Sequence, residues 1–132
     1  THISLWSMLA APLLIGCDMR SLYPFTLNLL TNDEVLSVDQ DPLGKAAMQV
    51  ASSDSVLVYE RTLSDGCRAV GVFNTGSRPA AMQLSMQVLG LSGRQKVRDL
   101  WRQQDVATVT GSYSVKDIPA HGVYLYRITP AP

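Results

Sequence analysis

The spacing of apolar residues changes near residue 45, and this change limits the folds open to the chain. Before it, apolar residues recur at helical spacing, and after it they alternate with polar residues, as in half-buried strands. The charge changes at the same place. Residues 1–44 contain one arginine and five acidic residues, whereas residues 45–132 contain ten basic and six acidic residues. We therefore predict two structural units, residues 1–44 and residues 45–132.

The first unit has the pattern of helices around a single strand. Helical spacing covers Thr1–Leu9 and ends before Pro12, which cannot continue a helix. The continuously apolar run Leu13–Gly16 predicts a buried parallel strand, because such strands are covered on both faces. Pro24 suits the first turn of a second helix, and Thr31–Glu34 has the form of a capping box for a third. The expected buried side of the first helix consists of Ile3, Leu5, Trp6, Leu9 and Ala10.

The second unit has the pattern of an antiparallel sandwich of about eight short strands. Turn residues separate its alternating segments at the spacing typical of that fold. The expected strands are Ser55–Arg61, Arg68–Asn74, Met82–Val88, Val97–Trp101, Val106–Thr110, Tyr113–Val115 and Val123–Ile128. The predicted fold class is thus an α/β remnant followed by an all-β domain, with Asp41–Gly44 as the turn between them.

Three stretches carry a resemblance to a known family. They are Ser4–Trp6 with Ala11–Arg20, then Leu30–Gly44, and more loosely Gly71–Asn74, Val97–Trp101 and Pro119–Val123. The run Asp39-Gln-Asp-Pro-Leu-Gly44 is the most specific. On these residues the chain resembles the C-terminal third of a glycoside hydrolase of family 27, the melibiase-like family of α-galactosidases and α-N-acetylgalactosaminidases.

The resemblance implies a (β/α)8 barrel followed by an antiparallel β-sandwich. On that template Thr1–Leu9 is similar to barrel helix seven, Leu13–Gly16 to barrel strand eight and Pro24–Asp39 to barrel helix eight. Family members are retaining glycosidases, which use two carboxylates about 5–5.5 Å apart. In the family both carboxylates lie upstream of the part that this chain matches.

The resemblance therefore implies a C-terminal fragment of an enzyme that cleaves terminal α-galactosyl residues. We expect the fragment to hold no catalytic residue, to be inactive alone, and to have the missing N-terminal barrel segment as its partner. The alternative is a non-catalytic β-sandwich module with a structural or carbohydrate-binding role. The sequence does not decide whether the parent enzyme acts on α-galactose, α-N-acetylgalactosamine or β-L-arabinopyranose. It also does not decide whether the parent is secreted, periplasmic or lysosomal.

Five polar or aromatic residues are candidates for function. Asp18 and Arg20 follow the expected barrel strand at the end where barrel active sites are built, although an aspartate there also commonly caps its own loop or pairs with a near neighbour. Trp101 is a weaker candidate for stacking on a sugar. Asp39 and Asp41 are expected to hold the junction between the two units, because a hard-cation site needs more oxygen ligands than they offer.

The composition argues against several other classes. A net charge of zero argues against nucleic acid as a partner, and the longest apolar run, Leu9–Ile15, is too short to span a bilayer. No glycine-rich phosphate loop is present, and we expect neither cofactor nor metal. The two cysteines do not form a disulfide framework. Cys17, within its apolar run, is expected to be a buried free thiol.

Overall fold

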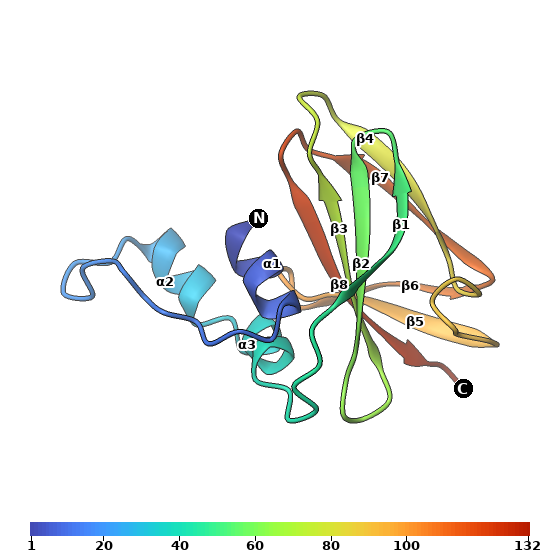
Figure 1. The fold of residues 1–132 in the computed structure, drawn as a ribbon, viewed down its shortest axis with the longest axis horizontal. Helices are drawn as coiled ribbons and strands as arrows, with labels where there is room; N and C mark the ends of the chain where they lie inside the picture. The colour runs from blue at the N-terminus through green and yellow to red at the C-terminus, as the bar shows by residue number, and fades with distance from the viewer.

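The computed structural model describes residues 1–132 as three short helices followed by an eight-stranded antiparallel β-sandwich (Figure 1). The helices are α1 (His2–Met8), α2 (Pro24–Leu30) and α3 (Asp33–Asp39). The strands are β1 (Met48–Ser53), β2 (Val56–Thr62), β3 (Arg68–Asn74), β4 (Ala80–Ser85), β5 (Arg94–Asp99), β6 (Gln104–Thr110), β7 (Ser112–Ile118) and β8 (Val123–Pro130). The predicted helices and the predicted antiparallel sandwich are confirmed.

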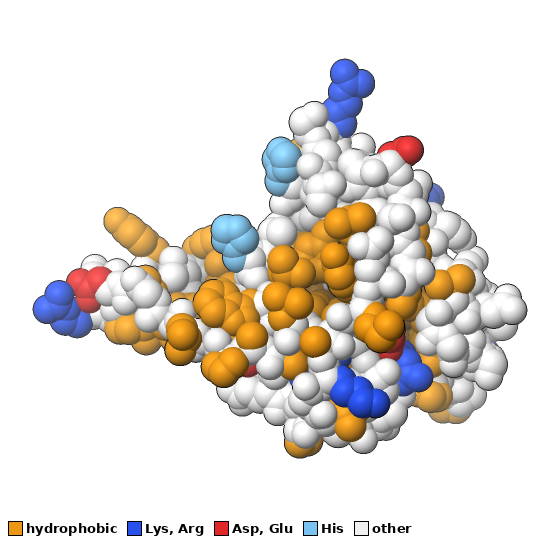
Figure 2. All heavy atoms as spheres, in the orientation of Figure 1, with side chains coloured by type: hydrophobic (Ala, Val, Ile, Leu, Met, Phe, Trp, Pro, Cys, Tyr) orange, Lys and Arg blue, Asp and Glu red, His pale blue; other side chains and the backbone are white.

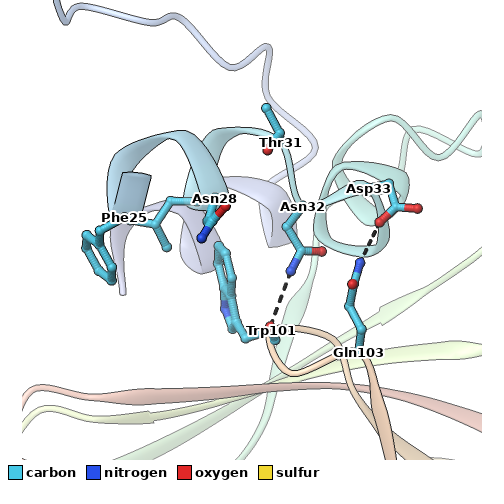
Figure 3. Close-up of a pocket in the computed structure, with 8 residues that line it drawn as sticks. Phe25, Asn28, Thr31, Asn32, Asp33, Trp101 and Gln103 are labelled. Atoms are coloured by element: carbon cyan, nitrogen blue, oxygen red, sulfur yellow. Dashed lines mark hydrogen bonds between the residues drawn. The ribbon is translucent and has the colours of Figure 1, made fainter. Parts of the chain in front are cut away.

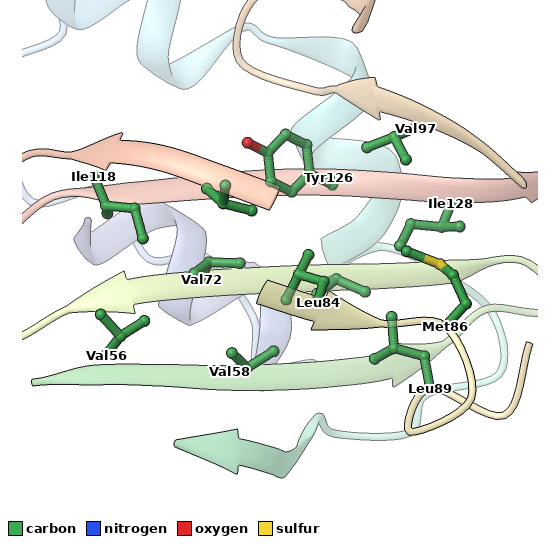
Figure 4. Close-up of a cluster of buried hydrophobic side chains, with 12 residues drawn as sticks. Val56, Val58, Val72, Leu84, Met86, Leu89, Val97, Ile118, Tyr126 and Ile128 are labelled. Atoms are coloured by element: carbon green, nitrogen blue, oxygen red, sulfur yellow. The ribbon is translucent and has the colours of Figure 1, made fainter. Parts of the chain in front are cut away.

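The sandwich consists of a large and a small sheet. The large sheet has the strand order β1-β2-β3-β8-β5-β6, and the small sheet pairs β4 with β7. Alternating apolar residues of both sheets meet between them, because each strand turns every second side chain to the same face. The resulting core contains Val56, Val58, Val70, Val72, Leu84, Met86, Leu89, Val97, Val115, Ile118, Tyr126 and Ile128 (Figure 4).

A second apolar cluster lies where helices α1 and α3 meet the sandwich. It contains Met8, Val35, Val38, Leu63, Ala69, Leu100 and Leu125. Strand β3 is buried at six of its seven positions, which is why its sequence reads as continuously apolar instead of alternating. This second cluster holds α1 and α3 on the sandwich.

Leu13–Gly16, which resembles a barrel strand, forms no strand within this chain. Residues 10–23 form no helix or strand, and all eight strands belong to the sandwich. Leu14 and Ile15 are 77% and 51% exposed. A strand needs a neighbouring strand to satisfy its backbone groups, and no segment of this chain lies beside Leu13–Gly16 in that way.

Helix α1 buries a different face from the one predicted. Ser4, Ser7 and Met8 are fully buried against the sandwich, whereas Leu5 and Leu9 are 36% and 48% exposed. Polar residues of the sandwich bind the small serines, as described below, so this side of α1 is held by hydrogen bonds as well as by packing. Of the apolar residues expected to be buried, Ile3 packs against the second cluster and Trp6 is half-buried, whereas Leu5 and Leu9 are exposed.

Four local details also differ from prediction. Asn32, not Thr31, caps α3, and its side-chain oxygen accepts a hydrogen bond from the Val35 amide at 3.1 Å. The strand expected to run to Val88 ends at Ser85, and β1 was not among the expected strands. Cys17 is an exposed free thiol, because its segment is not packed into a sheet.

Candidate functional site

Asp18 and Arg20 lie in the connection that leads to α2. Arg20 Nε and the Arg20 backbone amide each donate to Asp18 Oδ1 at 3.0 Å. The two side chains are 57% and 90% exposed, respectively. The side-chain and backbone hydrogen bonds from Arg20 hold the pKa of the Asp18 carboxyl below its ordinary value. Asp18 therefore pairs with its near neighbour, which is the local alternative that the sequence allowed.

Trp101 lies in an open groove of about 550 Å³ between α2, the start of α3 and the loop after β5 (Figure 3). Its Nε1 donates to Ser4 Oγ of α1 at 2.8 Å. Asn32 Nδ2 donates to the Leu100 carbonyl at 3.0 Å on the same side of the groove. Trp101 is thus a contact residue between the helices and the sandwich. The groove is lined by Phe25, Asn28, Leu29, Thr31, Asn32, Asp33, Trp101 and Gln103.

The groove presents aromatic and polar side chains but only one carboxylate. Its aromatic rings and side-chain amides are groups that commonly orient small polar ligands. Asp33 is the only acidic residue in its lining, and its Oδ1 accepts a hydrogen bond from Gln103 Nε2. Retaining hydrolysis of a glycoside needs two carboxylates, so the groove offers binding chemistry alone.

Neither a metal centre nor a membrane span is evident among the residues. No three His, Cys, Asp or Glu side chains are grouped so that they could hold a metal ion. The three helices have seven residues each, and none is long and apolar enough to cross a membrane.

Asp41 connects the turn after α3 to the β2–β3 hairpin. Its carboxylate accepts hydrogen bonds from the Ser64 amide at 3.0 and 3.1 Å, from Ser64 Oγ at 2.8 Å and from the Leu43 amide at 3.0 Å. Burial raises the Asp41 pKa, but these hydrogen bonds and the charge of Arg61 outweigh it, so the pKa lies below its ordinary value. Asp41 therefore makes the junction contact expected from the sequence.

Arg98 forms the second charged contact between the helices and the sandwich. Its Nε and Nη2 donate to the two Glu34 oxygens of α3 at 2.8 and 2.6 Å, and its Nη1 donates to Asp105 at 3.0 Å. The hydrogen bonds to Glu34 and then to Asp105 raise the pKa of Arg98. This bidentate geometry is the strong form of an arginine–carboxylate pair.

Arg61 is the junction residue that sequence reasoning missed. Its side chain is 1% exposed, although arginine is rarely buried unless paired. Its Nη1 donates to the Ser7 carbonyl in the last turn of α1. The only signal in the sequence is a charged residue within a strand, which does not tell a buried arginine from an exposed one.

Exposed apolar side chains gather on the helical segment. Figure 2 shows hydrophobic side chains gathered over α1, α2 and their connection. The exposed large apolar residues there are Leu5, Leu9, Leu14, Ile15, Met19, Tyr23, Phe25 and Leu27. A contiguous apolar surface of this kind marks an interaction site.

Comparisons with known proteins agree with this fold. The chain is 39% identical over 135 residues to the protein named "Probable alpha-galactosidase" of Dictyostelium discoideum, matching 98% of this chain and 35% of that protein. α-Galactosidase I from Mortierella vinacea has the same fold with a TM-score of 0.91 at 26% identity, over 98% of this chain and 34% of that one. A GH27 β-L-arabinopyranosidase from Geobacillus stearothermophilus gives a TM-score of 0.91 at 30% identity, over 98% of this chain and 29% of that one.

The chain spans about a third of the length of the relatives that it matches. Residues 53–128, which hold most of the sandwich, match the family described as the alpha galactosidase C-terminal beta sandwich domain. The resemblance to glycoside hydrolase family 27 is thereby confirmed, and the chain belongs to the family of α-galactosidase C-terminal β-sandwich domains.

Proposed function

We propose that this chain is the C-terminal part of a retaining α-galactosidase, in which residues 1–44 complete a catalytic barrel and the sandwich holds them in place. The observation that carries the proposal is the exposed apolar surface of α1, α2 and their connection (Figure 2). In the proposed parent this surface packs against the rest of the barrel.

The two faces of α1 support this arrangement. Ser4 and Ser7 bind the sandwich through Trp101 and Arg61, while Leu5 and Leu9 of the same helix are exposed. An isolated surface helix normally turns its apolar stripe toward the core. A helix that lies between two partners is expected to keep apolar residues such as Leu5 and Leu9 exposed when one partner is absent.

Leu13–Gly16 also has the features of a strand whose neighbouring strands are not part of this chain. Its backbone groups make no backbone hydrogen bond within the chain, and the side chains of Leu14 and Ile15 are exposed. Both features suit a barrel strand, whose edges and faces are covered by neighbouring strands and helices. As the eighth strand it brings Asp18 and Arg20 to the end of the barrel where substrate binds.

The chemistry follows from the same arrangement. We assign no catalytic carboxylate to this chain, so hydrolysis depends on two acids in the preceding barrel. Asp18 and Arg20 act, in this proposal, by shaping the edge of the sugar site, and Trp101 acts by holding α1 against the sandwich. The substrate class is terminal α-galactosides.

A chimera tests the proposal. The corresponding C-terminal third of α-galactosidase I from Mortierella vinacea is replaced by residues 1–132, and hydrolysis of p-nitrophenyl α-galactoside is measured. We expect the chimera to turn over substrate and the 132-residue chain alone to be inactive. A matched chimera that receives only residues 45–132 and retains the enzyme's own barrel end separates the sandwich from residues 1–44. Turnover by the isolated chain, or a folded full chimera without activity, contradicts the proposal.

A carbohydrate-binding module is the second candidate, because Phe25 and Trp101 line a groove that also presents amides. Titration of the chain with galactose and with raffinose tests it, with Phe25→Ala as the variant. Saturable binding that Phe25→Ala removes favours the module, and its absence removes this candidate.

A further inference from the structure

Arg61 is buried with part of its hydrogen-bonding capacity unused. Its Nη1 donates to the Ser7 carbonyl, but its Nε and Nη2 have no partner within the chain. A buried guanidinium whose N–H groups are unsatisfied is costly, because those groups lose water without a replacement. Something outside the polypeptide must therefore satisfy these donors.

Unsatisfied acceptors accompany these donors. Ser7 Oγ and Asp39 Oδ1 are both buried and without a hydrogen-bond partner within the chain. Ser7 belongs to α1, whose last turn contacts Arg61, and Asp39 is the last residue of α3. Burial raises the pKa of Asp39, and the nearby charge of Arg61 opposes that shift. Burial likewise lowers the pKa of Arg61, and the charges of Asp41 and Asp39 oppose that shift.

The donors and acceptors match the capacity of water. A water molecule accepts two hydrogen bonds and donates two, and buried waters typically make about three. Nε and Nη2 lie on the same edge of the guanidinium and can donate to one oxygen, while that water donates to Asp39 Oδ1 and Ser7 Oγ. Asp39 Oδ1 accepts no hydrogen bond from Arg61, and a direct pair between the two would leave Ser7 Oγ unsatisfied.

We propose that Ser7, Asp39 and Arg61 form a binding site for an ordered, buried water molecule, and that this hydrated cluster fixes α1 and α3 on strand β2. Arg61 is then a positioning residue for the whole helical segment. The proposal concerns contacts within residues 1–132 and does not rest on the proposed enzymatic function.

The water itself is the first test. In a crystal structure of the 132-residue chain that resolves buried waters, we expect one within hydrogen-bond distance of Arg61 Nε and Nη2. In solution, the Arg61 Nε proton of the isotope-labelled chain is expected to show a cross-relaxation signal with long-lived water. A direct Arg61–Asp39 ion pair, or a resolved structure without that water, overturns the proposal.

Substitutions test the positioning role. Ser7→Ala removes one acceptor with little change in volume, and Arg61→Lys keeps the charge but removes the fork of donors. We expect the amides of α1 and α3 to exchange with solvent roughly tenfold faster in both variants, while those of β8 stay unchanged. Arg20→Lys, at an exposed arginine, is the matched control. Unchanged exchange of α1 and α3 in Ser7→Ala overturns the positioning role.

Discussion

Gly44 provides a test of the junction between the helices and the sandwich. It closes the Asp41–Gly44 turn, with its amide donating to the Asp41 carbonyl at 3.0 Å, and its φ is +62°. A Cβ at this position meets no heavy atom within 4 Å. A side chain there is therefore opposed by backbone strain alone and not by a clash.

The cost of that strain follows from the left-handed conformation. A residue with a Cβ loses about 1–2 kcal/mol there, and a β-branched residue loses more. We expect Gly44→Val to lower the free energy of unfolding by about 1–3 kcal/mol. Gly44→Asn should lose less than about 1 kcal/mol, since asparagine enters this conformation more readily.

Gly16 is the matched control. A Cβ at Gly16 also meets nothing within 4 Å, and its φ is not in the left-handed region. Gly16→Val should therefore change the free energy of unfolding by no more than about 0.5 kcal/mol. Urea denaturation followed by the fluorescence of Trp6 and Trp101, the two tryptophans of the chain, measures all three variants. Equal midpoints for Gly44→Val and Gly16→Val, or equal losses for Gly44→Val and Gly44→Asn, refute this reasoning.

Three further predictions concern polar contacts, and urea midpoints check each one. The lowered pKa of Asp41 means that its contribution to stability is present above about pH 4 and is lost as the pH falls through the folded-state pKa. The midpoint difference between wild type and Asp41→Asn should accordingly shrink from pH 7 to pH 3, and a constant difference contradicts it. Arg98→Met should lower the urea midpoint, because it breaks the bidentate pair with Glu34 of α3. Lys96→Met, in a more exposed pair, should lower the midpoint less, and equal losses contradict the ranking. Asn74→Ala should cost roughly 2–3 kcal/mol, because the buried Asn74 amide donates to three backbone carbonyls, and a loss below about 0.5 kcal/mol counts against that role.

The elements that depend on local pattern were predictable from the sequence. Pro24 marks the start of α2, and Ser64–Gly66 marks the β2–β3 turn. Leu13–Gly16 has a strand's composition but not its neighbours, and pairing with a sheet is what makes an apolar run a strand. Thr31 and Asn32 are both good caps, and Asn32 alone also reaches the Leu100 carbonyl far along the chain. A tertiary contact, which the local sequence does not show, therefore decides which of the two residues caps α3.

The candidate site also contains contacts that the local sequence predicts and contacts that join distant parts of the chain. The Asp18–Arg20 pair spans two residues and could be expected from the sequence. Trp101 was expected at a strand end, but its hydrogen bond to Ser4 joins residues at opposite ends of the chain. The burial of Arg61 depends on where α1 docks, and the apolar stripe of α1 pointed to the wrong face. Periodicity indicates which residues share a face but not which of two partners that face contacts.

The claim that residues 1–44 complete a barrel is tested most directly by amide hydrogen exchange at Leu13–Gly16. In the isolated chain these amides make no backbone hydrogen bond, so they should exchange at nearly the unprotected rate, while those of β3 stay protected. In the full chimera with the Mortierella vinacea barrel, we expect strong protection of Leu13–Gly16, comparable to that of β3. Exchange of Leu13–Gly16 that is as fast in the folded chimera as in the isolated chain contradicts the claim that these residues complete a barrel.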